Sequence, residues 1–185
     1  AVETMTEVGV DEIVPWFAER MVTRWQGARG DRALRRWRVT AREAAKQSRR
    51  AWLPDVADPV TTAVLAQRLA GAEHAIVLHE DAAEPIGDLP LPVTGEVVLV
   101  VGPEGGITPD ELAVFDAAGA VRVTLGPTVL RTSTAGTVAA AVVLSRTARW
   151  RDAPGRRWSW GATRPGSSVS RTSAGDLPHR TGRPR

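Results

Sequence analysis

The sequence contains no cysteine and no tyrosine, one lysine and three histidines among its 185 residues. Without cysteine there are no disulfide bonds and no thiolate metal sites, and the scattered His74, His79 and His179 make a metal centre unexpected. No run of about 18 apolar residues is present, so we expect no membrane span. No signal-peptide pattern is found either. These absences indicate a cytoplasmic protein without a metal.

Charge is unevenly distributed along the chain. Residues 1–50 carry 11 basic and 7 acidic groups, residues 51–150 carry 5 and 12, and residues 151–185 carry 8 and 2. A polyanionic partner is therefore expected to contact the ends of the sequence rather than its middle.

The most informative stretch is 96–145, which contains two Gly-Pro loops, each after an apolar β-branched run. The first loop, GPEGG at 102–106, follows 97–101, and the second begins at Gly126-Pro127 after 121–125. Continuous apolar runs are typical of strands covered on both faces, as in parallel sheets. Because open α/β sheets bind ligands at the carboxyl ends of their strands, these loops are candidates for a binding site.

A helix with clear start and stop signals lies between the loops. Thr108 is the expected N-cap, Pro109 occupies the first helical position, and Glu111 completes a capping box. Gly119 provides the C-terminal stop.

The remaining elements follow from periodicity and from glycine and proline positions. A helix at 1–8 ends at Gly9, and in the helix at 59–71 Val60, Val64 and Leu65 are expected to face inward. We further predict strands at 10–16 and 75–78 and helices at 31–51 and 134–149.

The helix at 31–51 has a basic stripe, formed by Arg35, Arg38, Arg42, Lys46 and Arg49 at spacings of three and four residues. A solvated helix face is the plainer interpretation. The alternative is a surface that contacts RNA phosphates, since guanidinium groups pair with phosphate in a bidentate manner.

The composition changes after about residue 150. Of the 35 residues from 151 onward, 25 are Arg, Gly, Ser, Pro or Thr, without periodicity. Such a segment buries too little apolar surface to offset its ordering entropy, so 150–185 is predicted to be a disordered basic tail.

Together these segments resemble the ribosomal small subunit methyltransferase E family of the SPOUT superfamily. The matching sequence segments are TEVGVDEIVPWFAERMVTRW (6–25), RWRVTAREAAKQSRR (36–50), LHE (78–80), VGPEGGITPDEL (101–112) and LGPTVLRTSTA (125–135). They occur in the family's order and cover most of 1–149.

The resemblance implies an α/β fold with a mostly parallel sheet flanked by helices and a C-terminal deep trefoil knot. It implies S-adenosylmethionine (SAM) as cofactor, N3 of a uridine in 16S rRNA of the small subunit as target, and a homodimer with the last helix near its interface. It also implies that 1–149 is the catalytic domain and that the family's small N-terminal PUA-like RNA-binding barrel is missing. The implied cofactor residues are Leu78, His79, Gly102, Glu104, Gly105, Gly106, Leu125, Gly126, Leu130 and Thr132.

Four side chains near the loops need separate consideration. Arg131 is the first candidate for holding the uracil oxygens or a phosphate, and its plainer role is a structural pair with Glu104. Glu104 is a candidate base or loop orienter, or a carboxylate that caps backbone amides. His79 is either a cofactor contact or an ordinary polar strand end. Ser133 stands where the family commonly has Glu, so a carboxylate role is not expected there.

Three alternatives remain open. A nucleotide-binding α/β domain would use Gly105-Gly106 before a helix N-terminus, although there is no GxGxxG motif and no Walker lysine. A non-catalytic RNA-binding fragment would bind RNA without SAM. A SPOUT enzyme acting on the ribose 2′-oxygen is the nearest enzymatic alternative.

Overall fold

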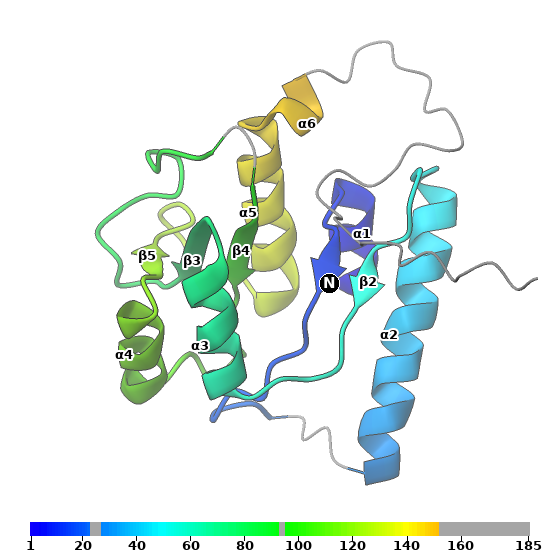
Figure 1. Ribbon diagram of the computed structural model, residues 1–185, viewed down its shortest axis with the longest axis horizontal. Helices are drawn as coiled ribbons and strands as arrows, with labels where there is room; N and C mark the ends of the chain where they lie inside the picture. Colours follow the sequence, from blue (N-terminus) through cyan, green and yellow to red (C-terminus); the bar gives the residue numbers. More distant parts are fainter. Residues whose placement is uncertain (23–26, 93–94, 152–185) are drawn as a thin grey trace, which may run out of the picture.

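The computed structural model describes residues 1–22, 27–92 and 95–151. The expected tail at 150–185 therefore lies almost wholly outside the described residues. The described part is an α/β structure (Figure 1), as the sequence predicts. In this part of the chain no helix is long and apolar enough to cross a membrane.

A three-stranded parallel sheet forms the centre of one half of the molecule. Its order is β4 (Val97–Val100), β3 (His74–Leu78), β5 (Val121–Val123), so the first of these strands in sequence lies in the middle. Both neighbours are parallel to β3, with Ile76 opposite Leu99 on one side and Val121 on the other. The carboxyl ends of all three strands therefore meet at one edge.

Helices cover both faces of this sheet (Figure 1). α3 (Thr62–Gly71) and α4 (Pro109–Ala117) pack on one face, where Leu69, Val77 and Phe115 are almost fully buried. α5 (Thr132–Ser145) packs on the other face, against Ile76 and Val123. The alternation of Ile76 and Val77 follows from the period of two in a strand.

The other half contains α1 (Val2–Val8), β1 (Glu12–Ile13), α2 (Gly27–Gln47) and β2 (Asp55–Val56). β1 and β2 form a short parallel pair. Val2, Ile13, Leu34, Ala41 and Val56 form its core, so α2 buries one apolar face against α1 and the β-pair.

The helix signals between the two loops are confirmed. The Thr108 hydroxyl accepts a hydrogen bond from the Glu111 amide (3.3 Å), and the Glu111 carboxylate accepts one from the Thr108 amide (3.0 Å). Gly119 has φ +85°, the left-handed conformation expected after a helix. Gly9 likewise ends α1 with φ +117°.

Several predicted boundaries are wrong, for local reasons. The strand at 10–16 reduces to β1 plus one isolated bridge between Trp16 and Val60, which also keeps Val60 outside α3. α3 begins after its N-cap Thr61, and Val64, predicted to face inward, is 48% exposed. Six of its ten residues are Ala, Val or Leu, which leaves too little contrast around this helix to orient it.

The two long helices also differ from the prediction. α2 starts at Gly27 rather than at residue 31 and ends at Gln47, so Arg49, with φ +54°, lies beyond the helix. The helix predicted at 134–149 is two: α5 ends at Ser145, and α6 (Ala148–Arg151) follows. At this break the Arg146 guanidinium donates to the carbonyls of Ile86 (3.1 Å) and Leu89 (2.6 Å), which holds the loop before β4.

Candidate functional site

The two Gly-Pro loops lie at the carboxyl edge of the central sheet. The first Gly-Pro loop, residues 102–106, follows β4, and the second Gly-Pro loop, residues 126–131, lies between β5 and α5. The Thr132 hydroxyl, in the first residue of α5, donates to the Gly102 carbonyl at 3.0 Å. This contact joins the end of one loop to the start of the other, 30 residues apart.

The predicted cofactor residues gather at this edge. Leu78 ends β3, and Leu78, His79, Leu125 and Leu130 are half-buried. The His79 imidazole Nδ1 accepts a hydrogen bond from the Asp81 amide at 3.2 Å, so one of its nitrogens serves the local turn. The strand topology thus explains why motifs that are far apart in the sequence form one candidate site.

The loops offer backbone groups rather than side chains. In the described part of the chain, the amides of Thr128, Val129 and Leu130 donate no hydrogen bond. Gly106 and Gly126 have φ +76° and +83°, which favours glycine at both positions. A ligand at this edge can therefore be recognised through main-chain donors and acceptors.

Arg131 and Glu104 do not form the structural pair considered above. Both side chains are exposed, and within the described residues neither has a hydrogen-bond or ion-pair partner. Arg131 is the residue immediately before α5, where the helix dipole adds partial positive charge. Ser133 is exposed in the first turn of the same helix.

A set of hydrogen bonds centred on Glu111, which we call the Glu111 brace, fixes residues 16–20 beside the first Gly-Pro loop. The residue pattern did not reveal it. Glu111 is 5% exposed, and besides its capping box it accepts from the Glu19 amide at 2.8 Å and from the Thr62 hydroxyl at 3.3 Å. Thr62 in turn accepts a hydrogen bond from the Trp16 indole (3.1 Å). A carboxylate that serves four donors on three segments fixes the path of residues 16–19 beside α4.

Arg20 continues this brace onto the loop. Its guanidinium donates to the Gly105 carbonyl at 3.4 Å, and a Cβ placed on Gly105 would lie 2.8 Å from the Arg20 carbonyl oxygen. Gly105 is therefore needed because the chain at residue 20 passes directly over it. The capping box was a visible signal for Glu111, but no local pattern indicates its contact with an amide 92 residues away.

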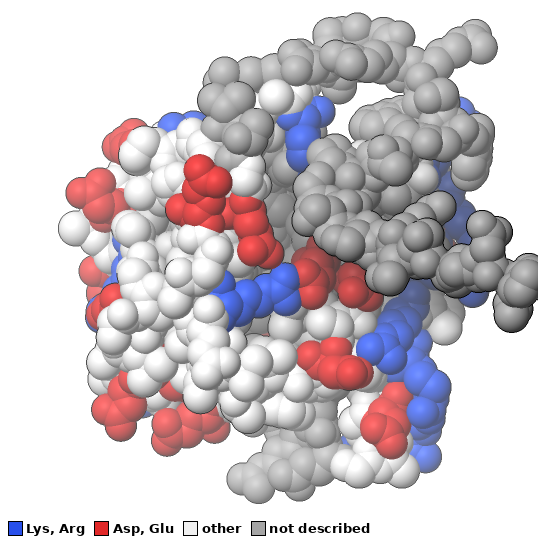
Figure 2. Space-filling model, viewed as in Figure 1, with Lys and Arg blue, Asp and Glu red and all other residues white. Residues whose placement is uncertain are grey.

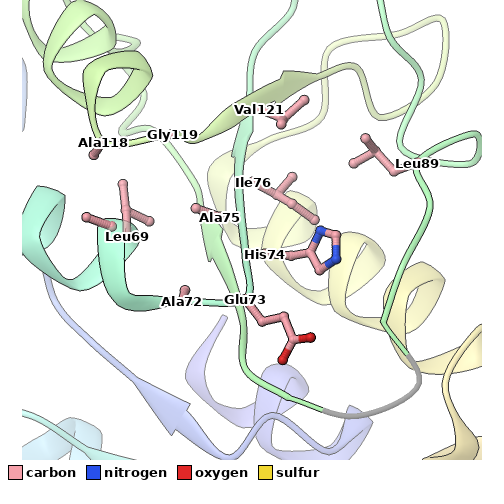
Figure 3. Close-up of a pocket in the computed structure, with 11 residues that line it drawn as sticks. Leu69, Ala72, Glu73, His74, Ala75, Ile76, Leu89, Ala118, Gly119 and Val121 are labelled. Carbon is pink, nitrogen blue, oxygen red and sulfur yellow. The ribbon is translucent and has the colours of Figure 1, made fainter.

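A hollow among the described residues lies elsewhere (Figure 3). It measures about 240 Å³ and lies at the amino end of β3, between Glu73, His74, Ala118 and Gly119. None of the predicted cofactor residues lines it. Since ligands of parallel sheets bind at the opposite edge, we assign this hollow no part in the site.

The side chains of the predicted basic stripe fall into two groups, those that pair with other residues and those that do not. Arg38 turns back to donate to the Val56 carbonyl (3.0 Å) and to pair with Asp58 (3.0 Å), and Lys46 pairs with Glu43 (2.8 Å). The ammonium of Lys46 holds the pKa of the Glu43 carboxyl below its usual value. Arg35, Arg42 and Arg49 are exposed and have no hydrogen-bond or ion-pair partner among the described residues, although the charge of Arg42 adds to the lowering of the Glu43 pKa. No group of three or more potential metal ligands occurs in the described residues.

Comparison with known proteins shows the family. Residues 1–144 match the model of the RNA methyltransferase domain family. Ribosomal RNA small subunit methyltransferase E of Mycobacterium bovis is 52% identical over 154 residues, and that of Synechocystis is 34% identical over 148 residues. These matches cover 81% and 75% of this chain, but only 59% and 46% of the relatives, so the chain spans about half the length of the relatives it matches.

Comparison with solved structures gives the same family. A methyltransferase from Legionella pneumophila, solved with bound SAM, superposes with a TM-score of 0.74 at 27% identity, over 79% of this chain and 60% of the other. The ribosomal RNA small subunit methyltransferase E of Neisseria gonorrhoeae, also bound to SAM, gives 0.68 at 31% identity, over 78% and 58%. The chain therefore belongs to the ribosomal RNA small subunit methyltransferase E family of SPOUT RNA methyltransferases.

Proposed function

We propose that this chain uses SAM to methylate N3 of a uridine in 16S rRNA of the small ribosomal subunit. The observation that carries the proposal is the meeting of the two Gly-Pro loops at the carboxyl edge of β4-β3-β5, with an unpaired Arg131 beside them. Family membership supplies the reaction class, and two solved relatives carry SAM in structures that superpose on this chain.

The residues at this edge fit SAM. Unpaired amides at 128–130 offer donors, and the half-buried Leu78, Leu125 and Leu130 offer apolar contacts at the end of the sheet. Of the predicted cofactor residues, only Glu104 is charged, so recognition rests mainly on the backbone. Bound SAM would supply an activated methyl group to the nucleophile.

Residues of the chain must align and deprotonate the target base. Methyl transfer is an in-line displacement, which makes orientation the main requirement. N3 of uridine carries a proton, so the site must also accept that proton or stabilise the anionic ring. We assign Arg131 to the uracil oxygens or a neighbouring phosphate, because its guanidinium is exposed and has no internal partner. Glu104 is the one carboxylate of the first Gly-Pro loop and the candidate base or loop orienter.

The assembly is part of the proposal. We propose that 1–149 is the catalytic domain, that its C-terminal loops form the deep trefoil knot implied by the family, and that two copies pair. Val138, an apolar residue of α5 that is 36% exposed, supports pairing near this helix. A metal is not required by any step.

The test is methyl transfer from radiolabelled SAM to small ribosomal subunits rebuilt on unmodified 16S transcript. We expect incorporated label to appear as 3-methyluridine after digestion to nucleosides. Label in 2′-O-methyluridine would instead identify the ribose methyltransferase alternative. SAM binding near one per subunit, with no ATP binding in a parallel titration, would exclude the nucleotide-binding alternative. RNA binding without SAM binding would indicate a non-catalytic fragment.

A further inference from the structure

The outward face of α2 is rich in basic side chains. Gly27–Gln47 carries seven basic and two acidic residues. In Figure 2 basic side chains gather over the lower part of α2, whereas acidic side chains are frequent on the opposite side, where α4 lies. The charge imbalance of the sequence is therefore also a separation in space.

Contacts show which of these groups are available. Arg38 and Lys46 are held by Asp58 and Glu43, as described above. Arg32, Arg35 and Arg42 are exposed and have no hydrogen-bond or ion-pair partner within the described residues. At 100° per residue these three fall within an arc of about 80°, on the side of α2 away from the buried Leu34, Ala41 and Ala44. They form a single outward row, which we call the α2 arginine row.

The spacing of the row favours an extended polyanion over a small anion. Three and seven residues separate its members, which corresponds to about 4.5 and about 10.5 Å along the helix axis. A single phosphate or nucleotide needs converging donors, whereas successive phosphates of a nucleic acid match charges laid out along a ridge. Guanidinium groups suit such contacts because they pair with phosphate through two hydrogen bonds.

The packing of α2 argues against an anionic membrane as the partner. A basic amphipathic helix binds a bilayer by inserting its apolar face. In this structure Leu34, Ala41, Ala44 and Ala45 are buried, with Leu34 and Ala41 in one core with Val2, Ile13 and Val56. The apolar face is therefore not available for insertion.

We propose that the α2 arginine row binds the phosphate backbone of ribosomal RNA, with Arg32, Arg35 and Arg42 as the contacting residues. This inference rests on the proposed function for the identity of the RNA. It places substrate docking on a surface separate from the Gly-Pro loops. Beside Arg42 a hollow of about 230 Å³, lined in part by the exposed Leu53 and by Pro54, adds apolar surface next to the guanidinium. An unstacked base can use such surface while its phosphate pairs with the arginine.

The test compares two variants of equal net charge. The double variant Arg35→Gln/Arg42→Gln removes two charges from the row. The control Gln67→Glu/Ala113→Glu changes net charge by the same amount at exposed positions of α3 and α4. Binding to 16S transcript is measured by filter retention at several salt concentrations, and SAM binding by calorimetry.

We expect the row variant to bind the transcript at least tenfold more weakly, with a log K against log salt slope shallower by about 1.4–1.8, as two lost phosphate contacts imply. The control should show a smaller loss and an unchanged slope. SAM affinity should be unchanged in both.

Equal RNA affinity and slope in the row variant and control would overturn the inference, as would retention on anionic phosphatidylglycerol vesicles but not on RNA. The two proposals fail separately. Loss of RNA binding in a row variant whose parent makes no 3-methyluridine would keep the docking surface and reject the proposed reaction.

Discussion

Replacing Glu111 by glutamine tests whether one buried carboxylate braces the candidate cofactor loop. The carboxylate accepts four hydrogen bonds: from the Thr108 amide (3.0 Å) and hydroxyl (3.1 Å) through Oε2, and from the Glu19 amide (2.8 Å) and Thr62 hydroxyl (3.3 Å) through Oε1. Glutamine keeps only one acceptor oxygen and turns an NH₂ group toward the other pair of donors. The hydroxyls can rotate to accept from it, but a backbone amide cannot.

The new glutamine side chain should adopt the orientation that gives up the less costly of the two backbone hydrogen bonds. Thr108 is 6% exposed, whereas Glu19 lies at the surface, where water can reach its amide. We therefore expect Glu111→Gln to keep the capping box and to release Glu19. Hydrogen bonds to charged groups are worth about 1.5–3 kcal/mol, and because water can reach the released amide we expect the lower end, about 1.5 kcal/mol. For a chain of this size that is roughly 3–6 °C in Tm.

The same substitution should also weaken cofactor binding. Once Glu19 is released, Arg20 no longer lies fixed over Gly105, and the first Gly-Pro loop has to be ordered by the cofactor itself. If most of the cost appears on binding, SAM affinity falls up to about tenfold, the equivalent of ~1.4 kcal/mol. Calorimetric SAM titration and urea unfolding measure the two effects on the same sample.

Asp110→Asn is the matched control, because Asp110 lies next to Glu111 in the first turn of α4 and is exposed. It loses the same charge near the helix N-terminus, worth about 0.3–1 kcal/mol, without breaking the brace. The reasoning is refuted if Glu111→Gln is no less stable than Asp110→Asn and binds SAM equally well.

Four further predictions concern single side chains. Arg131→Ala should lower turnover far more than SAM affinity, since we place the guanidinium on the substrate; normal turnover in steady-state kinetics would remove that role. Gly105→Ala should cost about 1–3 kcal/mol in urea unfolding, because its Cβ meets the backbone at residue 20; an unchanged midpoint would contradict the close approach. Ser133→Glu should raise the unfolding free energy by about 0.3–1 kcal/mol, as a carboxylate in the first turn of α5 favours the helix dipole, and lower stability would contradict this. The Arg122 guanidinium lowers the pKa of Asp116, so the pair stabilises the fold above the ordinary carboxyl pKa and loses that contribution as pH falls through the lowered value. The free energy of unfolding of Arg122→Ala should therefore differ less between pH 6 and pH 2.5 than that of the parent, by less than about 1 kcal/mol; a larger difference in the variant would contradict this argument.

Local signals of the sequence were sufficient for the elements around the site. Thr108, Pro109, Glu111 and Gly119 each act within one helix, so their pattern alone predicted α4 and its caps. The apolar runs predicted β3, β4 and β5 to within two residues, and parallel strands then required both loops at one edge.

Features that depend on distant segments were beyond the sequence. The strand order β4-β3-β5 depends on packing among three helices, so no single segment of the sequence predicts it. Arg38 looked like the other members of the stripe, yet it pairs with Asp58 across the loop that follows β2. The bracing role of Glu111 was hidden for the same reason, since the capping box already accounted for a glutamate at that position.

The position of Arg131 is itself set by contacts at the far end of the sequence. α5 lies against α1, where the Thr137 and Thr4 hydroxyls share a hydrogen bond of 2.7 Å. A Cβ on Gly136 would lie 3.0 Å from the Met5 sulfur, so glycine lets the two helices approach without a shift of the Met5 side chain. Because Arg131 immediately precedes α5, any shift of the helix away from α1 moves the guanidinium relative to the first Gly-Pro loop. In the proposed mechanism, the contact between α1 and α5 therefore helps to position Arg131 for the substrate, although it touches neither loop.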